Sequence, residues 1–291
     1  MTIDRRALLG GLTGAAMLAP FLAIERAMAQ HSEHPPPAAG SPSREGQQAM
    51  AARHDTMMQD LLGENLFKQE QVAMLLFPGF TALDLVGPHY FFACMFGATV
   101  HLVTTEQDLA PVASDLGLAI APTTRLADVP ADLDVLFTPG GSVGVLEVMR
   151  NDETMDWFSD RASRARYITS VCTGSMILAK AGLLKGKRAT SHWATRPVLA
   201  EFGAIPVDAR VVRDGNILTG AGVSAGIDFA IRLVEMLRGR SYAEGLVLQA
   251  EYAPDPPIDA GSRETAPAPI VEMYDVMFAP LAEQFRQLAT S

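Results

Sequence analysis

Cysteine is scarce in this chain, with only Cys94 and Cys172 among its 291 residues. Two thiols are too few for a disulfide framework. Neither stands in a CxxC pair or in a cluster with histidine, as the ligands of a structural metal site do. We therefore expect neither a disulfide scaffold nor a bound metal.

Positive charge is also in short supply. The chain holds 23 Lys and Arg against 33 Asp and Glu, a net charge of -10. Nucleic-acid binding needs clustered basic side chains, so we expect no nucleic-acid partner. Nucleotide loops are missing as well: the first apolar run is followed by no GxGxxG turn, and no GxxxxGK[ST] occurs. A dinucleotide cofactor is therefore not favoured.

What remains is an ordinary globular composition, 48% apolar, 19% charged and 7% aromatic. A chain of this length can bury one large core or two small ones.

Residues 1–29 differ from the rest and resemble an export signal. Arg5 and Arg6 precede an apolar stretch at 7–24, and a small-x-small cleavage signal ends at Ala29. The paired arginines indicate a twin-arginine signal, which predicts a periplasmic or exported protein without stable membrane contact after cleavage. The alternative is an uncleaved membrane anchor, which the glycines and proline of this stretch disfavour.

The following residues, 30–70, predict a Pro-rich flexible spacer and then one helix. Histidines here are interpreted as scattered surface residues: His31, His34 and His54. The main domain is expected at 71–270 and a C-terminal helix at 271–291.

Buried strands and helices alternate through the main domain. Continuous apolar runs of this kind predict a parallel sheet with helices on both faces, in one doubly wound α/β domain. About six strands are too few for an eight-stranded barrel. Strands are predicted at 71–78, 99–105, 133–141, 167–174 and 187–192, with a hairpin at 209–222; helices are predicted at 85–97, 151–165, 175–184, 226–239, 241–252 and 269–289.

Ligands of an open parallel sheet bind beyond the carboxyl ends of its strands. Several polar or conformationally special residues follow predicted strands and should meet at this edge: Asp84, Gly140, Gly141, Cys172, Thr173 and His192.

Cys172 lies between a strand and a helix, the arrangement of a nucleophile elbow. A helix N-terminus favours the thiolate, so we expect a lowered thiol pKa there. The alternative is a small buried residue that only packs, because free cysteine is among the most buried residue types. Packing is the preferred interpretation for Cys94, which lies inside an apolar helix.

The other residues at this edge also allow two interpretations each. Asp84 could cap the following helix, or act as an acid whose pKa burial raises. Gly140 and Gly141 could present backbone N–H groups to a developing negative charge, or simply form a tight turn. His192 could serve as a base for Cys172, or be structural.

Several motifs, in this order, resemble the DJ-1/PfpI superfamily, and most closely its isonitrile hydratase branch. They are LDLVGP at 83–88, TPGG at 138–141, SVCTGS at 170–175 and LQAEYAPDPP at 248–257, and the resemblance covers about residues 71–270. It implies a flavodoxin-like fold, a homodimer and no cofactor.

The resemblance also implies roles for the residues at the sheet edge. Cys172 would be the nucleophile, Thr173 would assist it, and Asp84 would be the acid. Gly141 would supply backbone hydrogen-bond donors. Gly140 and His192 would line the substrate pocket. Threonine after the cysteine removes the histidine that a peptidase or amidotransferase would use as its base. The implied reaction hydrates an isonitrile to a formamide. Two alternatives are a glyoxalase-like cysteine activity and a redox or ligand sensor; a DNA-binding regulator is disfavoured because no basic helix-turn-helix follows residue 252.

Overall fold

The structure is a computed structural model that describes residues 43–290. The predicted export signal and most of the spacer therefore lie outside the described residues. Contacts divide the chain into two compact units, Met1–Leu66 and Phe67–Ser291.

A helix lies where the sequence predicted one in the first unit. Helix α2 spans Arg44–Leu62, and a 3-10 turn, η2, follows at Gly63–Asn65. The helix begins at Ser43, whose hydroxyl accepts a hydrogen bond from the Gly46 N–H at 3.1 Å. His54 is exposed, as expected for a surface histidine.

A seven-stranded sheet forms the centre of the second unit, in the order β10-β11-β7-β6-β1-β2-β5. Every neighbouring pair is parallel except the hairpin β10–β11, so the predicted mostly parallel sheet is confirmed. Its strands are β1 (Gln71–Leu76), β2 (Thr99–Thr104), β5 (Thr124–Arg125), β6 (Val135–Thr138), β7 (Tyr167–Val171), β10 (Val211–Asp214) and β11 (Ile217–Gly220).

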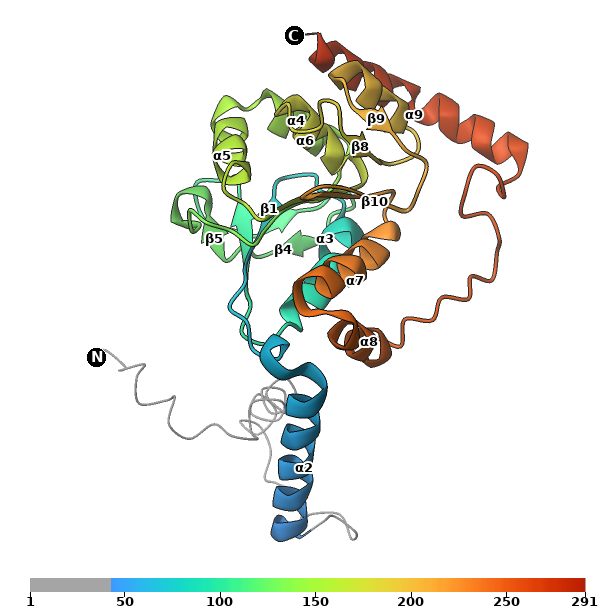
Figure 1. The fold of residues 1–291 in the computed structure, drawn as a ribbon. Coiled ribbons are helices and arrows are strands. Elements are labelled where there is room, and N and C mark those ends of the chain that lie inside the picture. Colours follow the sequence, from blue (N-terminus) through green and yellow to red (C-terminus); the bar gives the residue numbers. More distant parts are fainter. Residues whose placement is uncertain (1–42, 291) are drawn as a thin grey trace. The chain divides into compact units, whose positions relative to one another are not determined.

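Helices cover both faces of this sheet, which confirms the doubly wound, flavodoxin-like prediction (Figure 1). Helices α3, α7 and α8 lie on one face, and α4, α5 and α6 lie on the other. The helix bounds are α3 (Ala82–Ala93), α4 (Val143–Arg150), α5 (Asp152–Ala162), α6 (Ser175–Lys180), α7 (Ala225–Arg238), α8 (Arg240–Gln249) and α9 (Ala268–Ala289), with 3-10 turns η3 (Leu126–Asp128), η4 (Cys172–Gly174) and η5 (Arg196–Phe202).

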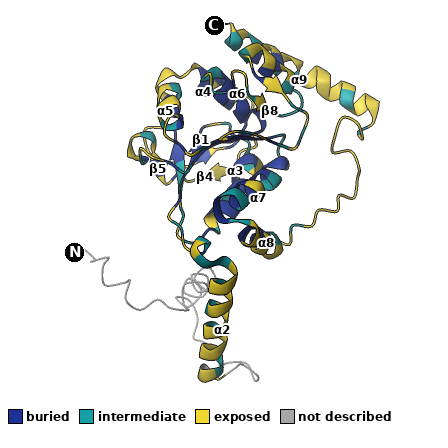
Figure 2. Ribbon diagram, in the orientation of Figure 1, coloured by how far each residue is buried: buried dark blue, intermediate teal, exposed yellow. Residues whose placement is uncertain are grey.

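The core lies between the sheet and its helices, where Figure 2 shows the buried residues. Three phenylalanines from α3, β6 and α7 meet on one face, with ring centroids 5.7 to 6.4 Å apart: Phe92, Phe137 and Phe229. Edge-to-face and tilted ring contacts of this kind add to the free energy gained by burying the rings. The core therefore ties the central strands to the α3–α7 layer.

The strand predicted at 187–192 is wrong as a strand of the main sheet. Only β8 (Arg188–Ala189) is extended, and it pairs with β9 (Ile205–Pro206) in a separate two-stranded sheet. The place beside β7 is taken by β11, whose four residues are all buried. Ile217 and Leu218 of β11 are removed from water in this position, whereas Arg188 of β8 is exposed, so burial of apolar surface favours β11 beside β7.

Helix α4 was not predicted, although four apolar residues on it are buried: Val145, Leu146, Val148 and Met149. Between β2 and β6 the chain also forms a small antiparallel hairpin, β3 (Val112–Ala113) with β4 (Ala119–Ile120). The hairpin predicted at 209–222 is confirmed: β10 and β11 pair antiparallel, and Gly215 in the turn between them has φ +64°.

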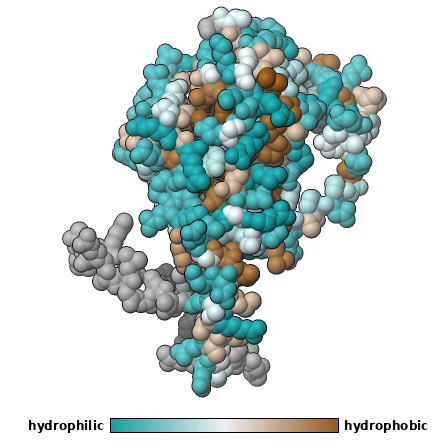
Figure 3. All heavy atoms as spheres, viewed as in Figure 1, coloured by the Kyte–Doolittle hydropathy of each residue, from teal (hydrophilic) through white to brown (hydrophobic). Residues whose placement is uncertain are grey.

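The face drawn in Figure 3 is mainly hydrophilic, with apolar side chains in separate groups. Within residues 43–290, no helix is both long enough and apolar enough to cross a membrane.

Candidate active site

Two turns meet at the carboxyl ends of β1 and β6 and bring the start of α3 to the edge of the sheet. The Thr81 N–H donates to the Gly140 carbonyl at 2.8 Å, and an isolated bridge joins Phe80 to Gly141. Asp84, in the first turn of α3, is thereby placed against the turn after β6.

Cys172 follows β7 directly and has φ +58°, a left-handed conformation that non-glycine residues rarely adopt. Its N–H donates to the Ala221 carbonyl at 2.9 Å. Its carbonyl accepts from the hydroxyls of Ser175 and Ser191, each at 3.1 Å. These bonds hold a strained backbone that turns the side chain toward α3, as at a nucleophile elbow.

Glycine is required on the two turns around the thiol. A Cβ on Gly140 would lie 2.6 Å from Asp84 Oδ2 and 2.7 Å from Cys172 Cβ. A Cβ on Gly174 would lie 2.6 Å from the carbonyl oxygens of Thr138 and Pro139. The close approach of β6 to the elbow therefore depends on the missing side chains.

Asp84 is fully buried, and its Oδ2 accepts a hydrogen bond from the Gly140 N–H at 2.9 Å. Among the described residues, its Oδ1 has no partner of ordinary hydrogen-bond geometry. Burial raises the pKa of Asp84 to about 7, against the opposing effects of the Cys172 thiol and the Gly140 N–H. The suggestion that Asp84 caps its helix is wrong, because Thr81 is the N-cap residue and the carboxyl is bonded to the neighbouring turn.

The thiol pKa differs from the expectation. Burial and the charge of Asp84 raise the pKa of Cys172, although the backbone N–H groups of Val223 and Thr173 act to lower it. The helix α6 that follows is only six residues long and begins after the 3-10 turn η4. Two acidic groups share one buried site, so the ionised form of each disfavours that of the other.

Thr173 holds the turn after β6 in place. Its Oγ1 accepts from the Gly141 N–H at 2.9 Å and donates to the Gly141 carbonyl at 2.7 Å. The Gly141 N–H was expected to point at a developing negative charge, but in the structure it is already donated to Thr173. The N–H groups near the thiol are instead those of Val223 and Thr173.

His192 lies apart from the acid–thiol pair. Burial lowers its pKa to about 4, with a further contribution from Arg196, and its Nδ1 lies 3.4 Å from the Ala194 N–H. Its ring packs on Trp193 and Phe278 and against Gly222, where a Cβ would lie 2.9 Å from His192 Cδ2. The interpretation of His192 as a base for the thiol has no supporting contact among the described residues.

The model of the DJ-1/PfpI family matches residues 70–236, which is more than half of the chain. The chain belongs to the DJ-1/PfpI family. It is 51% identical over 210 residues to isonitrile hydratase from Pseudomonas putida, a match that covers 72% of this chain and 90% of that protein. It is 34% identical over 150 residues to protein DJ-1alpha from Drosophila melanogaster, covering 51% of this chain and 69% of that protein.

Solved structures of the DJ-1/PfpI family have the same architecture. A THiJ/PfpI family protein from Pseudomonas syringae superposes with a TM-score of 0.76 at 45% identity, covering 89% of this chain and 99% of that one. DJ-1beta from Drosophila melanogaster superposes with a TM-score of 0.59 at 25% identity, covering 64% and 100% of the two chains. The homodimer and the exported location stay predictions.

Sequence reasoning missed two groups beside the acid–thiol pair of this DJ-1/PfpI protein. Asp115, on the β3–β4 hairpin, adds negative charge that raises the pKa of Asp84, and it accepts from Thr81 Oγ1 at 2.6 Å. Nothing in its local sequence indicates this position, because the hairpin folds back over the turn after β1. Val223 has a sequence signal that was overlooked: it follows the buried strand β11, which ends at the same edge as β7.

Among the described residues, no group of three or more His, Cys, Asp or Glu side chains could hold a metal ion. The arrangement at the sheet edge can perform nucleophilic and acid–base chemistry, because one thiol and one carboxyl are in mutual contact.

Proposed function

We propose that this protein hydrates an isonitrile to an N-substituted formamide, with Cys172 as nucleophile and Asp84 as proton carrier. The observation that carries the proposal is the buried Cys172–Asp84 pair, in which each group perturbs the pKa of the other. Identity of 51% to a protein named isonitrile hydratase, across most of that protein, supports the same chemistry here.

The first step adds the thiol across the terminal carbon of the isonitrile. The Asp84 carboxylate takes the proton of the Cys172 thiol, and the sulfur attacks the carbon, forming the C–S bond. The carbon lone pair then takes the proton from Asp84. The product is a thioimidate, R–N=CH–S–Cys172, and Asp84 is again a carboxylate.

The second step consumes one water. Asp84 takes a proton from water as the water oxygen attacks the thioimidate carbon, and the proton passes to nitrogen. The C–S bond of the resulting tetrahedral adduct breaks, its hydroxyl proton returns to sulfur through Asp84, and R–NH–CHO leaves. The sum is one isonitrile and one water to one formamide, with the enzyme unchanged.

The backbone around the pair supports both steps. The N–H groups of Val223 and Thr173 lower the pKa of the Cys172 thiol and so stabilise the transient thiolate. The Thr173 hydroxyl positions the Gly140–Gly141 turn, and the Gly140 N–H in turn holds Oδ2 of Asp84. Oδ1 is thereby left as the oxygen available for proton transfer.

The proposal is tested by incubating the purified protein with cyclohexyl isocyanide and measuring N-cyclohexylformamide by NMR. We expect turnover by the wild type and a loss of more than about a thousandfold in Cys172→Ala, since the covalent route is removed. Cys94→Ala is the matched control and should keep full activity, because Cys94 lies at the end of α3 away from the site.

Absence of formamide with the wild type, or equal turnover by Cys172→Ala, would contradict the proposal. Lactate formation from methylglyoxal by the wild type, without formamide formation, would assign the same thiol to a glyoxalase-like reaction instead.

A further inference from the structure

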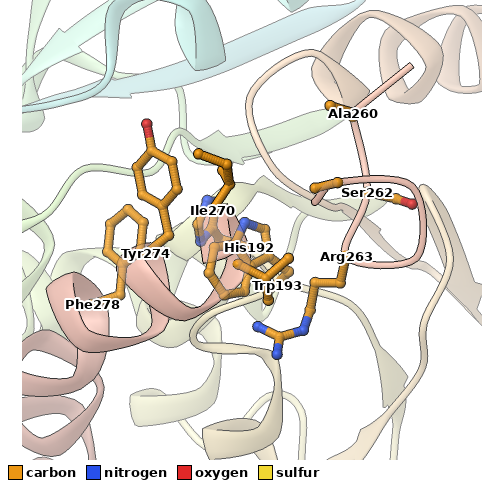
Figure 4. A pocket seen from close by; sticks show the side chains of 11 residues that line it. His192, Trp193, Ala260, Ser262, Arg263, Ile270, Tyr274 and Phe278 are labelled. Atoms are coloured by element: carbon orange, nitrogen blue, oxygen red, sulfur yellow. The ribbon is translucent and has the colours of Figure 1, made fainter. Parts of the chain in front are cut away.

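A cavity of about 300 Å³ lies beside the site, and neither Cys172 nor Asp84 lines it. We call it the ring cavity and define it by six lining residues, shown in Figure 4: His192, Trp193, Arg263, Ile270, Tyr274 and Phe278. Its volume is at the lower end of the range for small-molecule sites, so it suits a single ring.

Ring side chains from two distant parts of the chain build the wall. His192 and Trp193 follow β8, whereas Tyr274 and Phe278 come from α9. The Phe278 centroid lies 5.1 Å from His192, 5.7 Å from Trp193 and 6.1 Å from Tyr274, the last pair being stacked. Contacts at these distances hold the rings in fixed relative positions, so the apolar surface is preformed.

The one cation among the lining residues is already neutralised. The Arg263 guanidinium lies 4.9 Å from the centre of the Trp193 ring and forms an ion pair with Asp275, its Nη2 lying 2.9 Å from Oδ2. The lowered pKa of His192 keeps that imidazole neutral near pH 7. An ion would therefore gain no partner here and would lose its hydration, which favours an uncharged ligand.

The ring cavity also touches the backbone that surrounds the thiol. His192 packs against Gly222, and the next residue, Val223, directs its N–H toward Cys172. On the other side of His192, the Ser191 hydroxyl donates to the Cys172 carbonyl at 3.1 Å. A second cavity, lined by Val223 as well as His192 and Trp193, shares this wall.

We propose that the ring cavity binds an uncharged cyclic hydrocarbon group, such as the substituent of a cycloalkyl or aryl isonitrile or of its formamide. The choice of isonitrile and formamide rests on the proposed function. The ring site itself rests on the residues that line it.

Binding is tested with the fluorescence of Trp193 in a Trp157→Phe background, which removes the chain's other tryptophan. Titration with N-cyclohexylformamide should give a saturable change, and N-methylformamide should give none. Phe278→Ala should weaken the binding of N-cyclohexylformamide about tenfold, which is the effect expected when an apolar contact is lost. Val276→Ala, on the same helix but 71% exposed, should leave the affinity unchanged.

No saturable change with the cyclohexyl compound, or equal responses to both formamides, would overturn the site. Far-UV circular dichroism and the thermal midpoint of Phe278→Ala show whether α9 is still folded. If it is not, Tyr274→Ala serves as the second variant and must also weaken binding. The binding titration needs no turnover, so it tests the ring cavity even if the protein does not hydrate isonitriles.

A kinetic experiment shows whether the ring cavity binds the substituent of the substrate or only a free ring compound. If the ring cavity holds the substituent, Phe278→Ala lowers kcat/KM for cyclohexyl isocyanide about tenfold. The kcat/KM of the same variant for methyl isocyanide stays within about twofold of the wild-type value. Equal kinetics for both substrates, together with lost formamide binding, would confirm the ring site and overturn its use by the substrate.

Discussion

Asp84 and Cys172 show how one buried position can hold two acids without holding two charges. Asp84 has one oxygen bonded to the Gly140 N–H, and the thiol lies beside it in a site closed to solvent. Burial penalises ionisation of either group, and ionisation of one penalises the other. The pair therefore carries at most one negative charge near neutral pH, which is what a proton carrier paired with a nucleophile requires.

The raised pKa of Asp84 makes the fold less stable as pH rises. The folded pKa of about 7 exceeds the unfolded value of 3.8, so the folded state retains a proton that the unfolded chain has released. The contribution of protonated Asp84 to the free energy of unfolding is fully present below the unfolded pKa, and it is lost as pH rises through about 7.

Asp84→Asn removes this charge while keeping an oxygen acceptor for the Gly140 N–H. We expect its thermal midpoint to exceed that of the wild type by a margin that grows between about pH 4 and about pH 8. Differential scanning calorimetry across that range measures it. The exposed Asp132→Asn should show no such margin, and parallel curves for Asp84→Asn and wild type would refute the buried-carboxyl account.

Thr173 acts on the site through the turn that it holds. Thr173→Val keeps the shape but removes both hydrogen bonds to Gly141, so the turn that supports Asp84 loosens. We expect kcat for cyclohexyl isocyanide to fall about tenfold to about a hundredfold, and Thr173→Ser to restore most of it. Steady-state kinetics of both variants measure this. An equal fall of kcat in Thr173→Val and Thr173→Ser would show that the hydroxyl of Thr173 does not support turnover.

At the scale of elements, the site depends on how closely the turn after β6 approaches the elbow after β7. The sequence placed both turns at one edge of the sheet, because buried parallel strands align their carboxyl ends. The same reasoning placed four residues of the site there: Asp84, Gly140, Cys172 and Thr173. The direction of the Cys172 pKa could not be predicted, since it is set by the burial of the thiol and by the charge of Asp84, which comes from α3. His192 was placed on the wrong kind of element, because 187–192 resembles a strand only locally.

Gly140→Ala tests the close approach. The added methyl group would clash with both Asp84 Oδ2 and Cys172 Cβ. We expect a loss of about 1–3 kcal/mol in the free energy of unfolding and a severe loss of turnover. Urea unfolding and the formamide assay measure the two effects.

Gly245→Ala is the matched control, because nothing lies within 4 Å of its added methyl group on α8. It should keep activity and, as an alanine in a helix, lose no stability. Full activity in Gly140→Ala would contradict the geometry of the turn.

At the scale of the whole molecule, one buried ion pair joins elements far apart in the sequence. Arg238, at the end of α7, is 1% exposed and binds Glu70 with Nε–Oε1 at 2.7 Å. Its Nη2 also donates to the carbonyls of Lys68 and Phe96, at 2.9 and 2.8 Å. These bonds connect the α7 end to the segments before β1 and after α3.

Arg238→Met should lower the free energy of unfolding by about 3–5 kcal/mol, because Glu70 is left buried without its partner. The double variant Arg238→Met with Glu70→Leu should recover part of this loss, since it leaves no buried charge. Urea unfolding of the single and double variants provides the measurement. A single variant as stable as the wild type would show that the pair does not hold these elements together.

The central claim is that Asp84 carries the proton between thiol and substrate, and the pH dependence of kcat/KM tests it most directly. Asp84 must be ionised to accept the thiol proton, so kcat/KM for cyclohexyl isocyanide should rise with pH and level off above an apparent pKa of about 7. Asp84→Asn should show no such rise and should be slower by at least about a hundredfold at the plateau. A wild-type profile that is flat between about pH 5.5 and about pH 8.5, or an Asp84→Asn variant with the wild-type profile, would contradict the account.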